Sequence, residues 1–462
     1  SYLQFETYNH FERRITDSSG TFEIISEGNQ RPMRNIFFGN AGLEYELSKK
    51  TIIGLNVNGN IATINNVEKA QVNVISEGYV NYNTVKFRND SKSEVANPTY
   101  NANLTHKFDS VTNLSFSADY THYTEQASRY NTSHYYDNAN VEVIPQNRFG
   151  STINNNFNIY TQKLDFDKAF KKTWSIETGA KASFVNNDAN SVIELTNPAT
   201  QTLYVDSNYS NSYNYKERIL AGYFTIWKTF KKLDIRAGVR TEHTMIDGNN
   251  HPKPFTLHRD YINFFPSGSL DYKVNDKNTM QANYSYRIGR PSYDQLNPAR
   301  VFNDPFSNGA GNPTLKPEFG HAMGLNYNYN NFLNVGASYN IGINNIYFYA
   351  YGDPTTKVTV DSVFNFQSIN RGNLHVSVQK QIKWFSIHGF GGITFCNNKT
   401  LVHGLTVEKQ WAFYYGNMTA EFTLPKEIKI QLQGYYNDTS KDGIQTYQAF
   451  GVCHIVVSKS FF

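Results

Sequence analysis

Strict alternation of apolar and polar residues is the dominant pattern of this chain. From Leu333 to Asn344 the odd positions are apolar and the even positions are small or polar. Because successive side chains of a strand point to opposite faces, this pattern predicts a strand with one apolar face and one wet face. The same alternation returns at 114–121, 174–184, 233–240, 280–287 and 428–433.

Charged residues occupy the wet face in the middle of these predicted strands. A packed soluble core rarely tolerates such charges, whereas a wide barrel with a polar lumen and a lipid-facing exterior accepts them. We therefore predict an all-β membrane fold, a large antiparallel transmembrane β-barrel of about 18–22 strands. We expect the lumenal charges to pair across strands; they are Lys181, Arg236, Arg240 and Arg287 with Asp119, Glu177 and Asp234.

Short turns and long irregular segments separate the predicted strands. The short turns are expected at 48–51, 108–112, 170–174, 230–233, 275–278, 330–331, 382–385 and 425–427. Long irregular segments are expected near 88–96, 125–149, 187–213, 247–260, 288–315, 352–364, 398–408 and 437–445. Short periplasmic turns and long extracellular loops are typical of an outer-membrane barrel.

Composition agrees with strands that cross a membrane. Aromatic residues make up 15% of the 462 residues, hydrophobic residues only 39%, and mean hydropathy is −0.56. Only every second side chain of a barrel strand faces lipid, so a transmembrane barrel can combine high aromatic content with low mean hydropathy. No apolar run approaches the ~18 residues of a membrane helix. The net charge of +4 is too mild to indicate nucleic acid, and no nucleic-acid partner is expected.

One stretch carries more than periodicity. Three submotifs follow the strand-like residues 284–289 in order: Arg290-Pro291, then Leu296-Asn297-Pro298, then Gly311-Asn312-Pro313 with Pro317-Glu318. This order resembles the barrel of TonB-dependent receptors, particularly the outer-membrane barrel family abundant in Bacteroidetes, where it joins two mid-barrel strands.

The physical interpretation of this stretch is structural first, with direct ligand contact as the alternative. Its prolines remove backbone donors and fix φ, which makes a rigid loop that cannot extend the sheet. Gly309 and Gly311 allow tight turns beside the prolines. We expect Glu318, at the start of the next strand, to pair with Arg290 or Arg300.

The resemblance implies an outer-membrane receptor or transporter that takes up a ligand recognised by its extracellular loops. The family also has an N-terminal plug domain and a TonB box, and neither is visible here. We therefore expect 1–462 to be one barrel domain, which is incomplete at both ends, with a plug and TonB as partners, if the full chain is longer. The alternatives are a plugless accessory or structural barrel in an outer-membrane complex, and a passive channel.

No motif indicates an enzyme, a cofactor or a metal site. Catalytic signatures are absent from the sequence, and the histidines near Asp247 match no standard ligand spacing. Tyrosines beside Asn, Asp and Ser in the long loops are candidates for ligand or partner contact, or for an outer aromatic girdle; they are Tyr130, Tyr135, Tyr136, Tyr204, Tyr209 and Tyr213. We expect an integral protein of the Gram-negative outer membrane, in contact with its lipid and lipopolysaccharide, and with a surface lipoprotein or other outer-membrane subunits as further partners.

Overall fold

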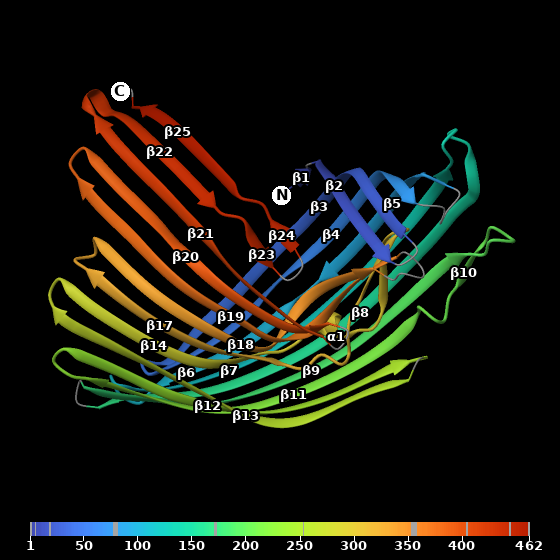
Figure 1. The fold of residues 1–462 in the computed structure, drawn as a ribbon. Helices are drawn as coiled ribbons and strands as arrows, with labels where there is room; N and C mark the ends of the chain where they lie inside the picture. Colours follow the sequence, from blue (N-terminus) through green and yellow to red (C-terminus); the bar gives the residue numbers. More distant parts are fainter. Residues whose placement is uncertain are drawn as a thin grey trace.

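The strands wind into one deeply curved sheet (Figure 1). The computed structural model describes residues 2–4, 6–17, 20–76, 82–170, 173–252, 254–352, 358–402, 405–442 and 445–460. The concave face of the sheet is called the lumen face here, and the convex face the outer face.

The strands of the first half are β1 (Tyr2–Gln4), β2 (Thr7–Asp17), β3 (Gly20–Ser48), β4 (Thr51–Ser76), β5 (Thr84–Ala96), β6 (Thr99–Lys107), β7 (Thr112–Tyr136), β8 (Glu142–Phe170), β9 (Trp174–Thr196), β10 (Leu203–Val205), β11 (Asn211–Thr229), β12 (Leu233–His251) and β13 (Phe255–Asn275). Those of the second half are β14 (Asn278–Gly289), β15 (Arg300–Asp304), β16 (Ser307–Ala310), β17 (Glu318–Tyr329), β18 (Leu333–Gly352), β19 (Thr359–Ile382), β20 (Phe385–Val402), β21 (Leu405–Leu424), β22 (Ile428–Asn437), β23 (Ser440–Asp442), β24 (Gln445–Tyr447) and β25 (Phe450–Lys459). Two short helices accompany them, α1 (Tyr293–Leu296) and the 3-10 turn η1 (Pro425–Glu427). Neither of these helices, in the described part of the chain, is long and apolar enough to cross a bilayer.

Neighbouring strands of the wall pair antiparallel in chain order. Within the part of the chain that the structure describes, the sheet holds 23 strands. β1 lies end to end with β2 along β3, and β10 lies end to end with β11 along β9. β5 and β6 share one place between β4 and β7. β15 and β16 belong to an insertion and not to the wall. About eighteen wall positions therefore follow one another, within the predicted range. Within the described residues β25 pairs with β22 and β1 and β2 pair with β3, so the curved wall has a seam between these strands.

Seven of the eight predicted short turns are confirmed, and they lie at one end of the sheet (Figure 1). In the eighth, at 170–174, β8 ends at Phe170 and β9 begins at Trp174, while residues 171 and 172 lie outside the described residues. The predicted irregular segments are largely wrong, because the strands continue through much of them. β7 extends to Tyr136, β9 to Thr196 and β12 to His251. Beyond the membrane both faces of a strand are wet, so apolar alternation disappears there while backbone pairing continues.

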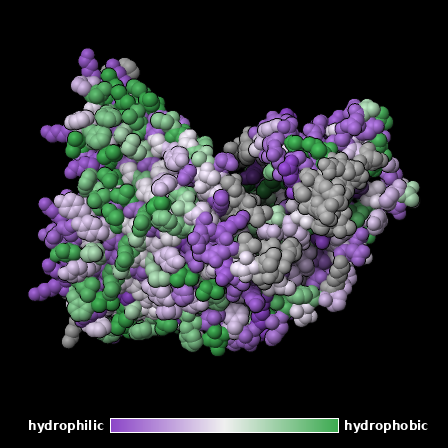
Figure 2. Space-filling model, in the orientation of Figure 1, coloured by the Kyte–Doolittle hydropathy of each residue, from purple (hydrophilic) through white to green (hydrophobic). Residues whose placement is uncertain are grey.

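A band of apolar side chains covers the outer face next to the short turns. In β18 the outward row runs from Leu333 to Ile343, and Val335 and Tyr339 are about half exposed. About ten steps of ~3.3 Å, tilted by ~40°, span roughly 25 Å, the height of the apolar band of an outer-membrane barrel. Figure 2 shows the hydrophobic residues gathered over the turn-bearing half of β20, β21, β22 and β25. These apolar portions are the membrane-spanning segments.

The lumen face carries charged and polar side chains, as the alternation predicted. Arg236 lies 3.9 Å from Glu177, two strands away, whereas Arg240 bonds Glu242 of its own strand at 2.5 Å. The predicted cross-strand pairing is thus confirmed for Arg236 and Glu177, whereas Arg240 pairs within its own strand.

Candidate functional site

The chain between β14 and β17 folds back onto the lumen face instead of standing outside the barrel (Figure 1). Gly289 and Glu318 are directly paired in the sheet, so residues 290–317 leave the wall and return to it at one point. These residues, called the lumen segment, contain α1, β15, β16 and all three submotifs.

Arg290 fixes the start of the lumen segment. Its Nη2 donates to Oε2 of Glu242 at 2.6 Å and to Oγ1 of Thr244 at 2.8 Å, and its Nε lies 4.0 Å from Glu217. Both carboxylates are less than a tenth exposed. Arg290 therefore holds together a buried ionic cluster between β11, β12 and the lumen segment.

Glu217 lies beyond the membrane-spanning part of β11, at the level where the outer face carries the ion pair of Arg218 and Asp247. Burial raises the pKa of the Glu217 carboxyl, while Arg290 and the hydroxyls of Tyr215 and Tyr293 act in the opposite direction. The lumen segment therefore covers a carboxyl group that water would otherwise solvate.

The predicted pairing of Glu318 with Arg290 or Arg300 is wrong. Oε2 of Glu318 accepts a hydrogen bond from the backbone N–H of Ile346 at 2.9 Å, and Arg300 donates to Asn308 at 3.1 Å. The reason is geometric, because Arg290 turns toward the carboxylates of β11 and β12, which chain order does not reveal.

The Leu-Asn-Pro submotif ends α1. A capping box between Ser292 and Gln295 starts this single turn, and Leu296 is buried beneath it. Oδ1 of Asn297 accepts from the backbone N–H of Ala299 at 3.0 Å and from Nδ2 of Asn211 at 3.0 Å. The submotif thus ties the turn to the wall.

The Gly-Asn-Pro submotif packs directly against this turn. A Cβ on Gly311 would lie 2.1 Å from the carbonyl oxygen of Asn297 and 2.6 Å from that of Asp294, so only glycine fits. Nδ2 of Asn312 donates to the carbonyl of Val363 on β19 at 2.9 Å. The prolines of the submotifs are part of the same packed region, in which Pro291 and Pro317 are buried.

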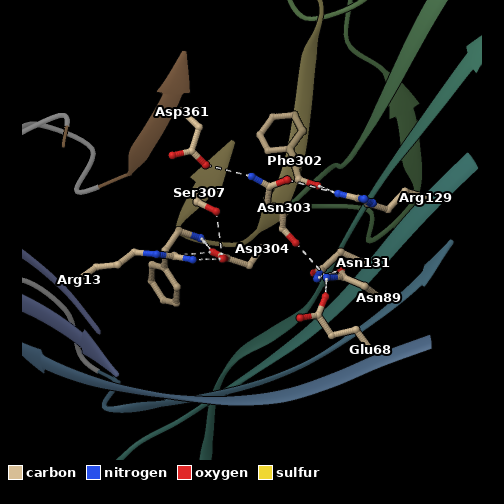
Figure 3. Close-up of polar contacts among 11 residues, drawn as sticks. Arg13, Glu68, Asn89, Arg129, Asn131, Phe302, Asn303, Asp304, Ser307 and Asp361 are labelled. Carbon is tan, nitrogen blue, oxygen red and sulfur yellow. Dashed lines mark hydrogen bonds and ion pairs between the residues drawn. The ribbon is translucent and has the colours of Figure 1, made fainter. Parts of the chain in front are cut away.

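Asp304 anchors residues 302–307, called the tip, on the far side of the lumen (Figure 3). Arg13 of β2 donates to both of its carboxylate oxygens, from Nη2 at 2.7 Å and from Nη1 at 3.2 Å. Asp304 also accepts from the backbone N–H of Phe306 at 2.7 Å and from the hydroxyl of Ser307 at 3.0 Å. The carboxylate is therefore fully engaged and nearly buried.

Asn303 joins the tip to three further strands (Figure 3). Its carbonyl accepts from Nδ2 of Asn89 on β5 at 2.9 Å, and its Oδ1 accepts from Nη1 of Arg129 on β7 at 3.3 Å. Its Nδ2 donates to Asp361 on β19 at 3.2 Å. Arg129 also donates to the carbonyl of Phe302 at 3.3 Å.

Two phenylalanines flank these polar contacts. The ring of Phe302 lies 5.2 Å from that of Phe149 and 5.7 Å from that of Tyr209. Phe306 enters a buried apolar cluster of β3, β4, β5 and β7, with Tyr82 packed against it at 6.5 Å. The tip is thus bound by aromatic, ionic and amide contacts together.

The tip also pairs with the wall through its backbone. β16 pairs parallel with β19, and the carbonyl of Phe306 accepts from the backbone N–H of Thr359 at 2.8 Å. Since β2, β5 and β7 belong to the early wall and β19 to the late wall, the lumen segment bridges two separate parts of the barrel wall.

Burial raises the pKa of the Asp361 carboxyl, and the charge of Asp304 adds to this effect. Arg13 and the amide of Asn303 act in the opposite direction. Asp361 pairs with Ala350, beyond the end of the apolar row of β18, so it lies outside the membrane.

The structure divides the six candidate tyrosines between the two faces. Three lie by the lumen segment: Tyr135 in the apolar cluster that holds Phe306, Tyr209 against Phe302, and Tyr213 fully buried near Leu296. The others lie on the surface, where Tyr130 covers Gly150, Tyr136 lies 4.8 Å from Nζ of Lys86, and Tyr204 is exposed. Ligand contact by any of the six stays a prediction.

Four wall residues that hold the tip were not predicted: Arg13, Asn89, Arg129 and Asp361. Each is a single polar residue in a different strand, so the sequence offers no local pattern that groups them. The histidines near Asp247, which the sequence did not favour as a metal site, lie on the outer face, where His258 bonds Asp247 at 2.8 Å and His243 bonds Asp260 at 2.6 Å.

Comparison with known proteins defines the fold further. The comparison with curated proteins gives no match. Among solved structures, the copper transporter OprC superposes with a TM-score of 0.59 at 11% identity, over 98% of this chain and 70% of that chain. The siderophore receptor PiuA from Acinetobacter baumannii gives 0.53 at 10% identity, over 98% and 74% of the two chains. The ferric citrate transporter FecA in its unliganded form gives 0.53 at 10% identity, over 99% and 71%.

At these identities the likeness concerns the fold, and it places the curved wall among outer-membrane barrels. The model of the outer membrane protein beta-barrel family matches residues 106–462, more than half of the chain. The chain therefore belongs to the outer membrane protein beta-barrel family and is an integral protein of the outer membrane.

Proposed function

We propose that this protein is an outer-membrane transport barrel that captures a ligand at its loop end and admits it by moving the lumen segment. The observation that carries the proposal is that residues 290–317 bridge the lumen and are bonded to both the early and the late wall. A segment in this position obstructs diffusion, so passage requires displacement of the segment.

Two further observations support transport. The lumen wall is polar, which suits a hydrated path. Solved structures with the same fold are named as transporters of copper and ferric citrate and as a siderophore receptor. The order of the submotifs resembles the Bacteroidetes type of TonB-dependent receptor, from which energy coupling through TonB and a plug domain would follow. A single barrel domain over 1–462 and a surface lipoprotein partner stay predictions of the same kind.

Conductance of the full-length protein in planar bilayers tests the proposal. Because Gly289 and Glu318 are paired, residues 290–317 can be replaced by Asn-Gly, which forms a two-residue hairpin turn. We expect the parent protein to show little steady current and the deletion variant to conduct.

A matched control is available in the loop between β9 and β10. Thr196 and Leu203 are also paired, so residues 197–202 can be replaced by the same Asn-Gly turn without touching the lumen. This control should stay closed. Steady current through the parent protein would favour the passive channel, and a folded but closed deletion variant would favour the accessory barrel.

A further inference from the structure

We infer that the wall residues around the tip form a peptide-binding site, which the tip itself occupies as a built-in competitor. The ligand class is a short peptide that folds into a hairpin turn and carries an acidic residue between two aromatic residues, as the tip does where β15 and β16 pair antiparallel on either side of residues 305 and 306. This inference rests on the proposed function, because the site becomes available only when the lumen segment moves.

β16, the returning strand of the hairpin that carries the tip, is bound as an added strand binds to a sheet. β16 extends along the upper end of β19 in parallel register from Ser307 to Ala310. The carbonyl of Phe306 accepts from Thr359, and those of Phe302 and Asn303 accept from Arg129 and Asn89. Main-chain bonding to β19 recognises the returning strand of such a hairpin whatever its sequence, while side-chain pockets select the sequence.

The side chains of the tip fill separate subsites. Phe302 lies between Phe149 and Tyr209, and Phe306 lies in the apolar cluster next to Tyr82. Between these two aromatic subsites, Arg13 binds the Asp304 carboxylate through two parallel bonds. Bidentate binding by a planar guanidinium favours a carboxylate at this place.

The amide part of the site is held in shape by the wall itself. Nδ2 of Asn131 donates to Oδ1 of Asn89 at 2.6 Å, and Nδ2 of Asn89 donates to Glu68 at 2.9 Å. Asn89 and Asn131 are 4% and 1% exposed. Since these bonds do not involve the tip, the wall site is preorganised for another peptide.

A basic residue in place of Asp304 is excluded by charge. It would meet the Arg13 guanidinium and leave that cation without its carboxylate partner. Like-charge contact therefore gives the site a preference for acidic over basic peptides.

The tether makes the tip a strong competitor. A covalently attached segment has an effective concentration of the order of millimolar, so a free peptide binds the intact protein weakly. Weakening the tip should raise the apparent affinity for free peptide by the factor by which the closed state was favoured.

Fluorescence anisotropy on the detergent-purified full-length protein tests this. The probe is a fluorescein-labelled synthetic peptide with the sequence of residues 301–308. Two variants free the wall site from the tip and are called the released backgrounds. The first carries Asp304→Asn and Phe306→Ala, which weaken the tip, and in the second residues 290–317 are replaced by Asn-Gly. We expect both to bind the probe about tenfold or more tightly than the parent.

Neighbouring arginines on β2 supply a matched pair of wall variants. Arg13 faces the lumen, whereas Arg14 lies on the surface with Glu23. In either released background Arg13→Gln should weaken probe binding about tenfold or more, and Arg14→Gln should leave it unchanged. A probe with lysine at the position of Asp304 should not bind.

Each outcome of these binding experiments either supports or overturns the peptide site. Absence of probe binding overturns the peptide site if the variants with a weakened or deleted tip are folded, as shown by an electrophoretic mobility that changes on heating. Equal effects of the two arginine variants, or equal binding of the lysine probe, also overturn it. Binding in detergent does not require passage. A deletion variant that conducts but binds no probe thus overturns this inference alone, and one that binds the probe but stays closed overturns the proposed function alone.

Discussion

Removing the Arg13 guanidinium should loosen the lumen segment. In the parent protein two bonds of 2.7 and 3.2 Å join Arg13 to Asp304, whose side chain is only 9% exposed. Arg13→Gln keeps much of the side-chain length but leaves a nearly buried carboxylate without its cation.

Removing one partner of a fully buried pair costs about 3–5 kcal/mol. Arg13 is 23% exposed and faces a polar lumen, so water replaces part of the lost interaction and we expect about 2–3 kcal/mol. Because 1.4 kcal/mol corresponds to a factor of ten, the ratio of open to closed segment should rise roughly 30- to 150-fold.

Single-channel recording in planar bilayers measures this ratio as the open fraction. Arg14→Gln, on the adjacent residue and the opposite face, is the control and should match the parent. Asp304→Asn should also raise the open fraction, and the double variant should show less than the sum of the two effects, because both changes remove one interaction. Equal open fractions for Arg13→Gln and Arg14→Gln would refute the reasoning.

Three more predictions concern packing, membrane facing and pH. Gly311→Ala places a Cβ 2.1 Å from a backbone carbonyl oxygen, so it should lower the temperature at which heating unfolds the barrel and changes its electrophoretic mobility. Gly309→Ala should leave this temperature unchanged, because the atom nearest to its Cβ would be 3.8 Å away. Leu325→Lys puts a charge on the outer face in the middle of the apolar band at a cost of ~2–4 kcal/mol, so its yield in outer membranes should fall below that of Asn326→Lys on the lumen face; equal yields would contradict the assigned faces. Burial raises the pKa of Asp361 above its ordinary 3.8, so protonation favours the attached segment, and the open fraction should rise as pH increases through the raised pKa and then level off. Asp361→Asn should weaken this pH dependence, and the part that remains should come from Glu217, whose pKa is also raised by burial beneath the lumen segment; recording from about pH 4 to 7 checks it.

The lumen segment shows how far the sequence alone leads. Its prolines and glycines predicted a rigid insertion between two strands, and Gly311 and Asn312 do pack against α1 and β19. Local chemistry is sufficient for this because proline and glycine restrict the backbone wherever they occur. The place of the insertion, across the lumen, has no such local signal.

The contacts of the tip explain why. Asp304 is 291 residues from Arg13, and Asn303 is 214 from Asn89 and 58 from Asp361. A single polar residue on a wet strand face has the same appearance in sequence whether it meets water or a partner. The misassigned partner of Glu318 has the same origin, since the strand neighbours that attract Arg290 are known only once the sheet is formed.

The sequence by itself determined the strands, their lipid and lumen faces in the membrane, and the short turns, because a strand alternates with period two and lipid accepts only apolar side chains. The sequence did not determine the parts of the strands that extend beyond the membrane, where water on both faces removes the alternation. Only the tertiary structure decided that one insertion crosses the lumen and that four remote polar residues hold it, because these contacts depend on the curvature that brings the early and late walls face to face.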